Sequence, residues 1–337
     1  MDSLDRRDFL GLTLAAGAAA ALPAPLALAR PRRRSSLEGT FFDASPLGGS
    51  GNASAILGEG GNSLLLKSGD ASLLVDSKLG PFGRVLLDDI RKLGAGRDLT
   101  VLNTHHHGDH TGGNHAFKDA ALVRAHENAF PKFEASMDWY RSMGEQAVRQ
   151  LDQMPADKRG LAEPAIMDYA ERLADLAAGD FLPDTPITEP ETIIDIGGLT
   201  VMLYAYGPGH TDNDVVVSIP ELNIIHTGDL VFNGWNPFMD ANGGCDPRNW
   251  VGVLENVEKL CDADTIVVPG HGEIGDVSII RGQIAYIQRI FQEVGRSIGQ
   301  EQTREQVTET TYAFQHGLGG EWIRPIANGF IYDLLQE

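Results

Sequence analysis

Five of six consecutive residues in one segment of the chain carry side chains that can bind a metal. Residues 105–110 of this 337-residue sequence read His-His-His-Gly-Asp-His. The apolar run Leu99–Leu102 precedes them and predicts a short buried strand that ends where the histidines begin. Because alternate side chains of an extended segment point the same way, we expect His105, His107 and Asp109 to converge on one point.

His110 follows at a place where the chain can turn. Gly112 and Gly113 come soon after it, and glycine lets the backbone bend sharply. Imidazoles that converge with a carboxylate form a site for a borderline metal such as zinc. The alternatives are a polar loop that is rich in histidine by chance and a storage-type histidine tract, but a tract would be repetitive and would not be fixed between a strand and a glycine pair. The segment therefore predicts a metal site.

Three further ligand candidates lie downstream, each after an apolar run and next to a glycine. They are His210, Asp229 and His271, which follow Gly209, Gly228 and Gly270. Ligands delivered from strand ends on glycine-bearing loops indicate a site along one edge of a β scaffold. A single histidine of this kind is more typical of a surface, but the threefold repetition favours ligands.

The combined pattern resembles the metallo-β-lactamase superfamily. The resemblance rests on HxHxDH at residues 105–110, followed by GHT at His210, GD at Asp229 and GH at His271. The resemblance covers roughly Gly51 to Val294, which is most of the chain. It implies an α/β fold, the αββα sandwich, with metals in a cleft at one edge of the sheets.

The resemblance also implies two metal ions per chain, with each ligand assigned to one of them. The first ion would be held by His105, His107 and His210, the second by Asp109, His110 and His271, and Asp229 would bridge both. Such a pair holds a hydroxide between the ions at neutral pH. We expect Zn²⁺, with iron or manganese as alternatives. Asp109 would also act in catalysis, by orienting the nucleophile or moving its proton.

Asp229 bears on the substrate. Within the superfamily, β-lactamases carry cysteine or serine at this position, and an aspartate is more like glyoxalase II, the lactonases and related esterases. The long helical stretch between His110 and His210, and the lack of a short basic cluster for glutathione, count against glyoxalase II. We therefore predict an exported dinuclear zinc hydrolase that cleaves an ester, thioester, lactone or amide bond. A β-lactamase is the first alternative.

An oxidoreductase is the alternative from another class. Iron-dependent persulfide dioxygenases share the implied fold and hold one iron with the residues equivalent to His105, His210 and Asp229. Metal analysis discriminates, because two zinc ions per chain favour hydrolysis and one iron favours the dioxygenase. A non-catalytic binding protein would have lost ligands, and all seven are present.

The chain is strongly acidic. Its 47 Asp and Glu residues exceed its 27 Lys and Arg residues, which gives a net charge of −20. Phosphate binding requires clustered basic residues, so the composition excludes nucleic acid as a partner and favours a small-molecule substrate. The sequence does not indicate an oligomeric state.

The N-terminal residues 1–29 are typical of a secretion signal. Arg6 and Arg7 form a twin-arginine pair, and an Ala- and Leu-rich stretch then runs to a small-x-small cleavage site at Ala27 and Ala29. This stretch is too short for stable membrane insertion. We expect a periplasmic or secreted protein, with residues 30–50 as a linker and residues 51–337 as the catalytic domain.

Several further elements follow from the pattern. Strands are predicted at residues 53–57, 63–66 and 72–75, and Asp76, after the last of them, is either a turn residue or a group that orients a ligand. Residues 127–179 predict a helical insertion whose aromatic and Met stripe is either core or a lid over the cleft.

A helix is also predicted at residues 247–260, with Asp246 as its cap and Pro247 in its first turn. Cys245 and Cys261, the only cysteines, lie at its opposite ends, about 20 Å apart. A disulfide needs Cα atoms within about 7 Å, so the two should not pair. Cys245 either faces the cleft or fills a loop.

Overall fold

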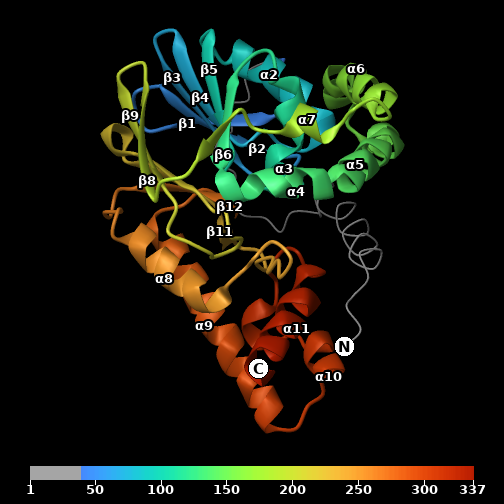
Figure 1. Ribbon diagram of the computed structural model, residues 1–337, viewed down its shortest axis with the longest axis vertical. Helices are drawn as coiled ribbons and strands as arrows, with labels where there is room; N and C mark the ends of the chain where they lie inside the picture. Colours follow the sequence, from blue (N-terminus) through green and yellow to red (C-terminus); the bar gives the residue numbers. More distant parts are fainter. Residues whose placement is uncertain (1–38) are drawn as a thin grey trace. The chain divides into compact units, whose positions relative to one another are not determined.

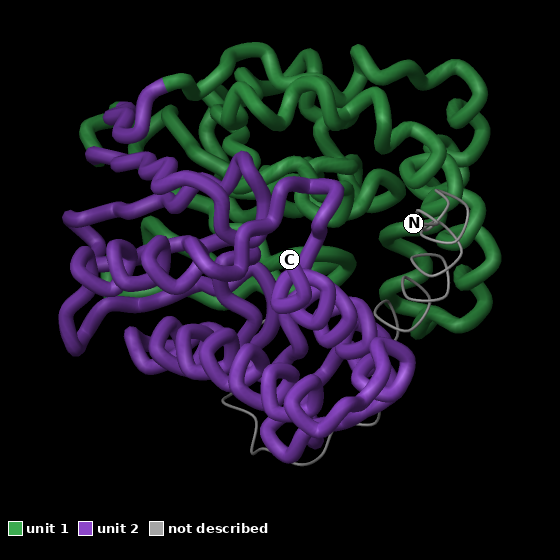
Figure 2. Tube along the Cα trace, turned by 60° about the horizontal axis from the view of Figure 1, so that its bottom comes forward, with its two compact units in different colours: residues 1–188, 195–199 green, residues 189–194, 200–337 purple. Residues whose placement is uncertain are grey.

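The computed structural model describes residues 39–337, which form two compact units (Figure 2). Unit 1 lies within residues 1–188 and 195–199, and unit 2 comprises residues 189–194 and 200–337. The range predicted as one catalytic domain, residues 51–337, is therefore divided between the two units. The predicted signal, residues 1–29, lies outside the described residues.

Unit 1 is built on a seven-stranded sheet with the strands in chain order (Figure 1). The strands are β1 (Asp43–Leu47), β2 (Ala53–Leu57), β3 (Ser63–Ser68), β4 (Ala71–Val75), β5 (Asp98–Leu102), β6 (Leu122–His126) and β7 (Thr185–Ile187). The first four are antiparallel, and β4 to β7 are parallel. Parallel strands are buried on both faces, which explains why β4 is buried continuously from Ser72 to Val75.

Helices and short helical turns connect the later strands of unit 1. They are η1 (Gly80–Phe82), α2 (Gly83–Lys92), α3 (Gly108–Thr111), η2 (Gly112–Ala116), η3 (Glu127–Ala129), α4 (Phe130–Ala135), α5 (Met137–Gln150), η4 (Leu151–Gln153), α6 (Ala156–Arg172) and α7 (Ala178–Phe181). The face of α2 that carries Val85, Leu86 and Ile90 packs into the same core as Leu65 and Leu74. The buried apolar residues of α2 thus lie on one face, as in an amphipathic helix.

The predicted helical insertion is present as α4, α5 and α6. Its aromatic stripe is core, because Phe133, Tyr140 and Tyr169 are buried together with Phe181 of α7. The rings of Tyr140 and Phe181 stack at 4.3 Å between centroids. Since the stripe is used in packing, only the exposed side of the insertion remains for the predicted lid.

Unit 2 is built on a five-stranded sheet in the order β12-β11-β10-β9-β8. Its strands are β8 (Glu191–Ile196), β9 (Leu199–Tyr204), β10 (Val216–Ile219), β11 (Ile224–Asn233) and β12 (Ile266–Gly272). Its helical elements are η5 (Pro220–Leu222), α8 (Pro247–Glu258), α9 (Val277–Gly299), α10 (Arg304–Glu309), η6 (Ala313–Gln315) and α11 (Ile323–Gln336). Among residues 39–337, no helix is both long and apolar enough to cross a membrane.

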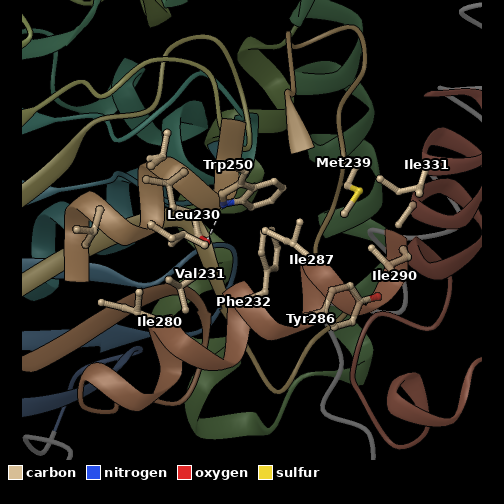
Figure 3. Close-up of a cluster of buried hydrophobic side chains, with 14 of the residues drawn as sticks. Leu230, Val231, Phe232, Met239, Trp250, Ile280, Tyr286, Ile287, Ile290 and Ile331 are labelled. Atoms are coloured by element: carbon tan, nitrogen blue, oxygen red, sulfur yellow. Dashed lines mark hydrogen bonds between the residues drawn. The ribbon is translucent and has the colours of Figure 1, made fainter. Parts of the chain in front are cut away.

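The core of unit 2 joins α8, α9 and α11 to β11 (Figure 3). Trp250 of α8 is fully buried, and its indole N–H donates to the Leu230 carbonyl at 3.0 Å. This bond satisfies the one polar atom of a large buried ring, as burial requires. Ile287 and Ile290 of α9 complete the same cluster.

The helix predicted between the cysteines is confirmed. The Asp246 side chain accepts hydrogen bonds from the backbone N–H groups of Arg248 and Asn249, with Pro247 in the first turn. Cys245 and Cys261 are both free, as expected from their separation. Cys245 packs against the unit 2 core, which favours its role as a loop filler, and burial raises the pKa of its thiol.

One boundary predicted from sequence is wrong. Residues 30–50 were expected to be a linker, but β1 lies within them and pairs with β2, with Asp43 opposite Leu57. The strand is five residues long, contains Pro46 and is followed by a Gly-Gly pair, so its pattern is that of a loop. An edge strand tolerates proline, which a central strand does not.

Candidate metal centre

The histidine-rich segment of unit 1 leaves β5 and then turns into the short helix α3. His107 has extended backbone angles and caps this helix, and Thr111 donates its hydroxyl hydrogen bonds to the carbonyls of His106 and His107. His105 and His107 therefore point the same way, with 3.1 Å between His105 Nε2 and His107 Nδ1.

The expected convergence of Asp109 with these two histidines is wrong in its geometry. Gly108 begins a helical turn, so the two-residue alternation of an extended chain ends at His107. Asp109 approaches His110 instead, with 3.6 Å from its Oδ2 to His110 Nε2. The segment thus presents two neighbouring ligand pairs and not one convergent triplet.

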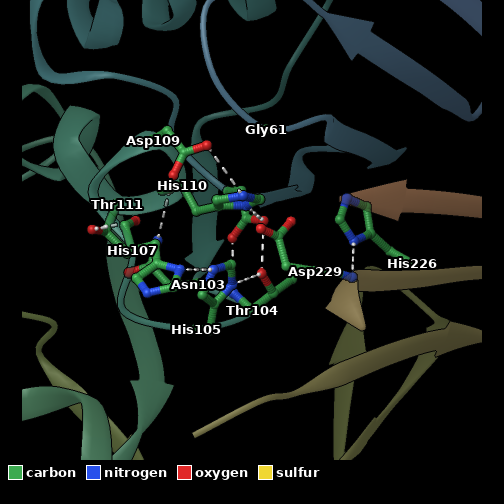
Figure 4. A network of polar contacts seen from close by, with 12 residues as sticks. Gly61, Asn103, Thr104, His105, His107, Asp109, His110, Thr111, His226 and Asp229 are labelled. Atoms are coloured by element: carbon green, nitrogen blue, oxygen red, sulfur yellow. Dashed lines mark hydrogen bonds and ion pairs between the residues drawn. The ribbon is translucent and has the colours of Figure 1, made fainter. Parts of the chain in front are cut away.

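Asp76 orients two of these histidines. Its carboxylate accepts from the Thr104 backbone N–H and from the Thr104 hydroxyl, both at 2.8 Å, and contacts His110 Nδ1 at 2.7 Å. Since the only hydroxyl proton of Thr104 goes to Asp76, the Thr104 oxygen accepts from His105 Nδ1 at 3.0 Å (Figure 4). Both rings are left with Nε2 as the atom able to bind a metal. Of the two roles predicted for Asp76, orientation of ligands is the one the structure shows.

We expect Asp76→Asn to lower zinc affinity by about 10- to 100-fold, as measured by competition with a chelator. Asn tolerates the left-handed backbone of this residue, which has φ 62°, but its single carbonyl oxygen replaces a carboxylate that serves three donors. Asp89→Asn is the matched control, because Asp89 is equally buried but accepts from Phe41 and Phe42. Equal loss of affinity in both variants would contradict the role of Asp76.

The loop around Gly61, which packs against His110, was not predicted from the sequence. A Cβ on Gly61 would lie 2.0 Å from the His110 ring, and the Gly61 N–H donates to the Asp109 carbonyl at 3.1 Å. The fully buried Lys78 donates to the carbonyls of Gly61 and of Ile56. Burial lowers the pKa of Lys78 to about 7, although nearby carboxylates, Asp76 first, raise it. Lys78, which lies between Asp76 and the pair Leu79-Gly80, is the feature of the sequence that could have indicated this support.

Helix α5 of the insertion also contacts the segment. A Cβ on Gly108 would lie 2.0 Å from the Trp139 ring, so only glycine fits between His107 and Asp109. The Tyr140 hydroxyl contacts the Thr111 hydroxyl at 3.0 Å. The insertion therefore braces the histidine-rich segment.

Unit 2 holds the other three predicted ligands, His210, Asp229 and His271. Asp229 Oδ2 lies 3.6 Å from His210 Nε2 and 3.4 Å from His271 Nε2, so one carboxylate oxygen faces both imidazoles. His210 Nδ1 donates to the Phe238 carbonyl at 2.8 Å, which leaves Nε2 as its metal-binding atom. The Phe232 ring stacks on His271 with centroids 5.3 Å apart.

Two of these residues lie within strands and not, as predicted, on loops after them. Asp229 is inside β11, and His271 is inside β12. The pairing of these strands shifts register on both sides of Gly228, which has φ 53°, and such an irregularity re-aims the neighbouring side chain. A Cβ on Gly270 would lie 1.9 Å from Asp229 Oδ1, so glycine is required there.

The spacing of the ligand atoms fits zinc. Two nitrogens bound to one tetrahedral zinc ion at about 2.0–2.1 Å are about 3.3 Å apart. The pairs assigned to a common ion that lie within one unit are His105–His107, Asp109–His110, His210–Asp229 and His271–Asp229. Their separations are 3.1, 3.6, 3.6 and 3.4 Å. All four are therefore compatible with shared ions.

Curated relatives match the central part of the chain. It is 26% identical to "Metallo-beta-lactamase type 2" of Bacillus cereus over 195 residues, which is 58% of this chain and 60% of that protein. It is 29% identical over 182 residues to "Probable metallo-hydrolase YqjP" of Bacillus subtilis strain 168, covering 51% and 54%. The chain thus spans about three fifths or less of the length of these relatives.

Solved structures agree on the fold. The VMB-1 crystal structure aligns with a TM-score of 0.51 at 19% identity, over 74% of this chain and 97% of that one. The metallo-β-lactamase FIM-1 from Pseudomonas aeruginosa aligns with a TM-score of 0.51 at 16% identity, over 73% and 95%. The predicted α/β fold class is confirmed. The family model of the metallo-beta-lactamase superfamily matches residues 56–271, more than half of the sequence and the range that holds all seven ligand candidates. The chain therefore belongs to the metallo-β-lactamase superfamily.

Proposed function

We propose that this protein is a dinuclear zinc hydrolase. The observation that carries the proposal is the spacing of the four ligand pairs, 3.1 to 3.6 Å, within a segment matched by the family model. In the proposed centre His105, His107 and His210 would hold one ion, Asp109, His110 and His271 would hold the other, and Asp229 would serve both. The names of the curated relatives, a metallo-β-lactamase and a probable metallo-hydrolase, support this enzyme class.

When bound, the two ions would polarise the scissile carbonyl and bring the pKa of a bound water towards neutrality. The protein's own groups prepare the ligands for this chemistry. Thr104, which is held by Asp76, accepts the Nδ1 proton of His105, and Asp76 itself accepts that of His110. The Phe238 carbonyl accepts the Nδ1 proton of His210. The Asp109 carboxylate, 26% exposed, is the group we assign to orient the attacking water and to move its proton.

The substrate we propose contains an ester, thioester, lactone or amide bond. Asp229 has two carboxylate oxygens, one of which faces both imidazoles, whereas the cysteine or serine that β-lactamases carry there has a single ligand atom. β-Lactam hydrolysis is the second candidate, because the Bacillus cereus relative is named for that activity. A small-molecule substrate suits both.

A hydrolase panel on zinc-loaded protein tests this function, with esters, thioesters, lactones, amides and β-lactams compared by kcat/KM. We expect an ester, thioester or lactone to be the best substrate. A penicillin or carbapenem as the best substrate would select the second candidate. A single bound iron, with persulfide oxidation and no hydrolysis, would select the dioxygenase instead.

We also propose that the protein is exported. Arg6→Lys combined with Arg7→Lys should leave the precursor in the cytoplasm, because the twin-arginine pair is the recognised feature. Fractionation of a bacterial host measures the outcome, with the Arg33→Lys and Arg34→Lys double variant as control. Normal export of the Arg6 and Arg7 variant would contradict the proposal.

A further inference from the structure

Two metal-ligand histidines of unit 2 each have a half-buried aromatic ring beside them. The Trp235 ring lies 6.1 Å from that of His271, and the Phe238 ring lies 6.4 Å from that of His210. The Trp322 ring extends the row, 6.2 Å from Phe238. We call Trp235, Phe238 and Trp322 the aromatic wall.

The wall is not needed to hold the histidines. Phe232, which is buried, already stacks on His271, and the backbone carbonyl of Phe238, not its ring, fixes His210. The three rings of the wall are also not fully used in the core, since each keeps part of its surface exposed. Trp250, by contrast, contacts His210 as well but is completely buried and bonded to Leu230.

The C-terminal part of the chain holds the wall in place. Gly319 pairs with Trp235 in a parallel bridge, in which Gly319 N–H donates to Gly234 at 2.9 Å and Asn236 N–H donates to Gly319 at 3.0 Å. A Cβ on Gly319 would lie 2.7 Å from the Trp235 indole, so the backbone lies directly against the ring. The Asn236 side chain donates a second bond to the Gly319 carbonyl at 3.0 Å.

Gly319 and Trp322 lie outside residues 56–271, the range that the family model matches. The wall therefore combines a loop after β11 with a segment that lies beyond the matched range. Partly exposed aromatic rings beside reacting groups bind apolar and aromatic portions of a ligand by stacking and by burial from water.

We propose that the aromatic wall is the subsite for an aromatic or long-chain acyl group of the substrate. This proposal rests on the hydrolase function proposed above and specifies its substrate class. Trp235 and Phe238 would contact the acyl group next to the ligand histidines, and Trp322 would contact its far end. Enzymes gain selectivity from such contacts because each buried apolar group adds to transition-state binding.

The test compares p-nitrophenyl phenylacetate with p-nitrophenyl acetate on zinc-loaded protein. For Trp322→Ala, the ratio of the two kcat/KM values should fall about tenfold, and Trp235→Ala should behave alike. Phe330→Ala is the matched control, since this half-buried aromatic of α11 contacts the unit 2 core and should leave the ratio unchanged. An unchanged ratio in both tryptophan variants, with normal metal content, would overturn the proposal.

Calorimetric binding of phenylacetate and of acetate separates this proposal from the proposed function. The wild type could hydrolyse neither ester and yet bind phenylacetate at least about tenfold more tightly than acetate. If Trp322→Ala then removes this difference, the aromatic wall is confirmed as a binding subsite and the hydrolase assignment is wrong. Equal binding of the two carboxylates by the wild type would overturn the wall. Should Trp322→Ala fail to fold, Trp322→Leu, which keeps more apolar volume, replaces it in both measurements.

Discussion

Replacing His107 by alanine is expected to remove metal and activity together, with kcat/KM reduced by at least about hundredfold. Even loss of a group that only orients a ligand costs about 10- to 100-fold, and His107 is proposed as a direct ligand. Its Nδ1 lies 3.1 Å from His105 Nε2, so the variant leaves one imidazole without its neighbour at the ion. Metal analysis and turnover of the best substrate, on the same preparation, measure the effect.

His316→Ala is the matched control for this variant. His316 is an exposed histidine of unit 2 that lies outside the seven predicted ligands, so its loss should alter neither metal content nor rate. Full activity in the His107 variant, or an equal loss in the control, would contradict the assignment of the centre.

Replacing Gly270 by alanine is expected to have an effect of similar size without removing any ligand. The added Cβ would lie 1.9 Å from Asp229 Oδ1 and 2.7 Å from the Asp229 backbone nitrogen, so the carboxylate must move. A displacement of about 1 Å at a reacting centre can cost about hundredfold in rate. We expect kcat/KM to fall by this factor and the metal to bind more weakly, as measured by turnover and by chelator competition.

Gly282→Ala separates this effect from a general response to alanine. Gly282 lies exposed on α9 of the same unit, and a Cβ there would meet no atom within 4 Å. Alanine in a helix stabilises by about 0.5–1 kcal/mol relative to glycine, so activity should be retained and thermal stability should rise. Retention of rate and metal in the Gly270 variant would show that the close approach to Asp229 is unimportant.

The sequence predicts those parts of the fold in which local pattern and final structure agree. The strand at residues 53–57 and the capped helix after Asp246 appear with the expected starts, because each combines apolar periodicity with a clear turn or cap. The C-terminal elements α10 and α11 were not predicted. The strand β1 was missed because its pairing with β2 comes from a neighbour and not from its own five residues.

The candidate ligands were predictable from residue type and spacing, but their supports were not. The sequence left two roles open for Asp76, because its contact with His110 joins residues that are 34 positions apart. The need for glycine at Gly61 and Gly270 depends on rings and carboxylates from other elements. Asp109 was misplaced in space because the turn into α3 begins one residue before it.

The most direct test of the dinuclear zinc assignment is the metal content of the mature protein, measured by inductively coupled plasma mass spectrometry with protein quantified by amino-acid analysis. The protein should be stripped with a chelator and then titrated with zinc while hydrolysis is followed. We expect activity to return with zinc and to reach its maximum near two ions per chain. Saturation at one ion per chain, or full activity in the stripped protein, would contradict a centre with two zinc ions.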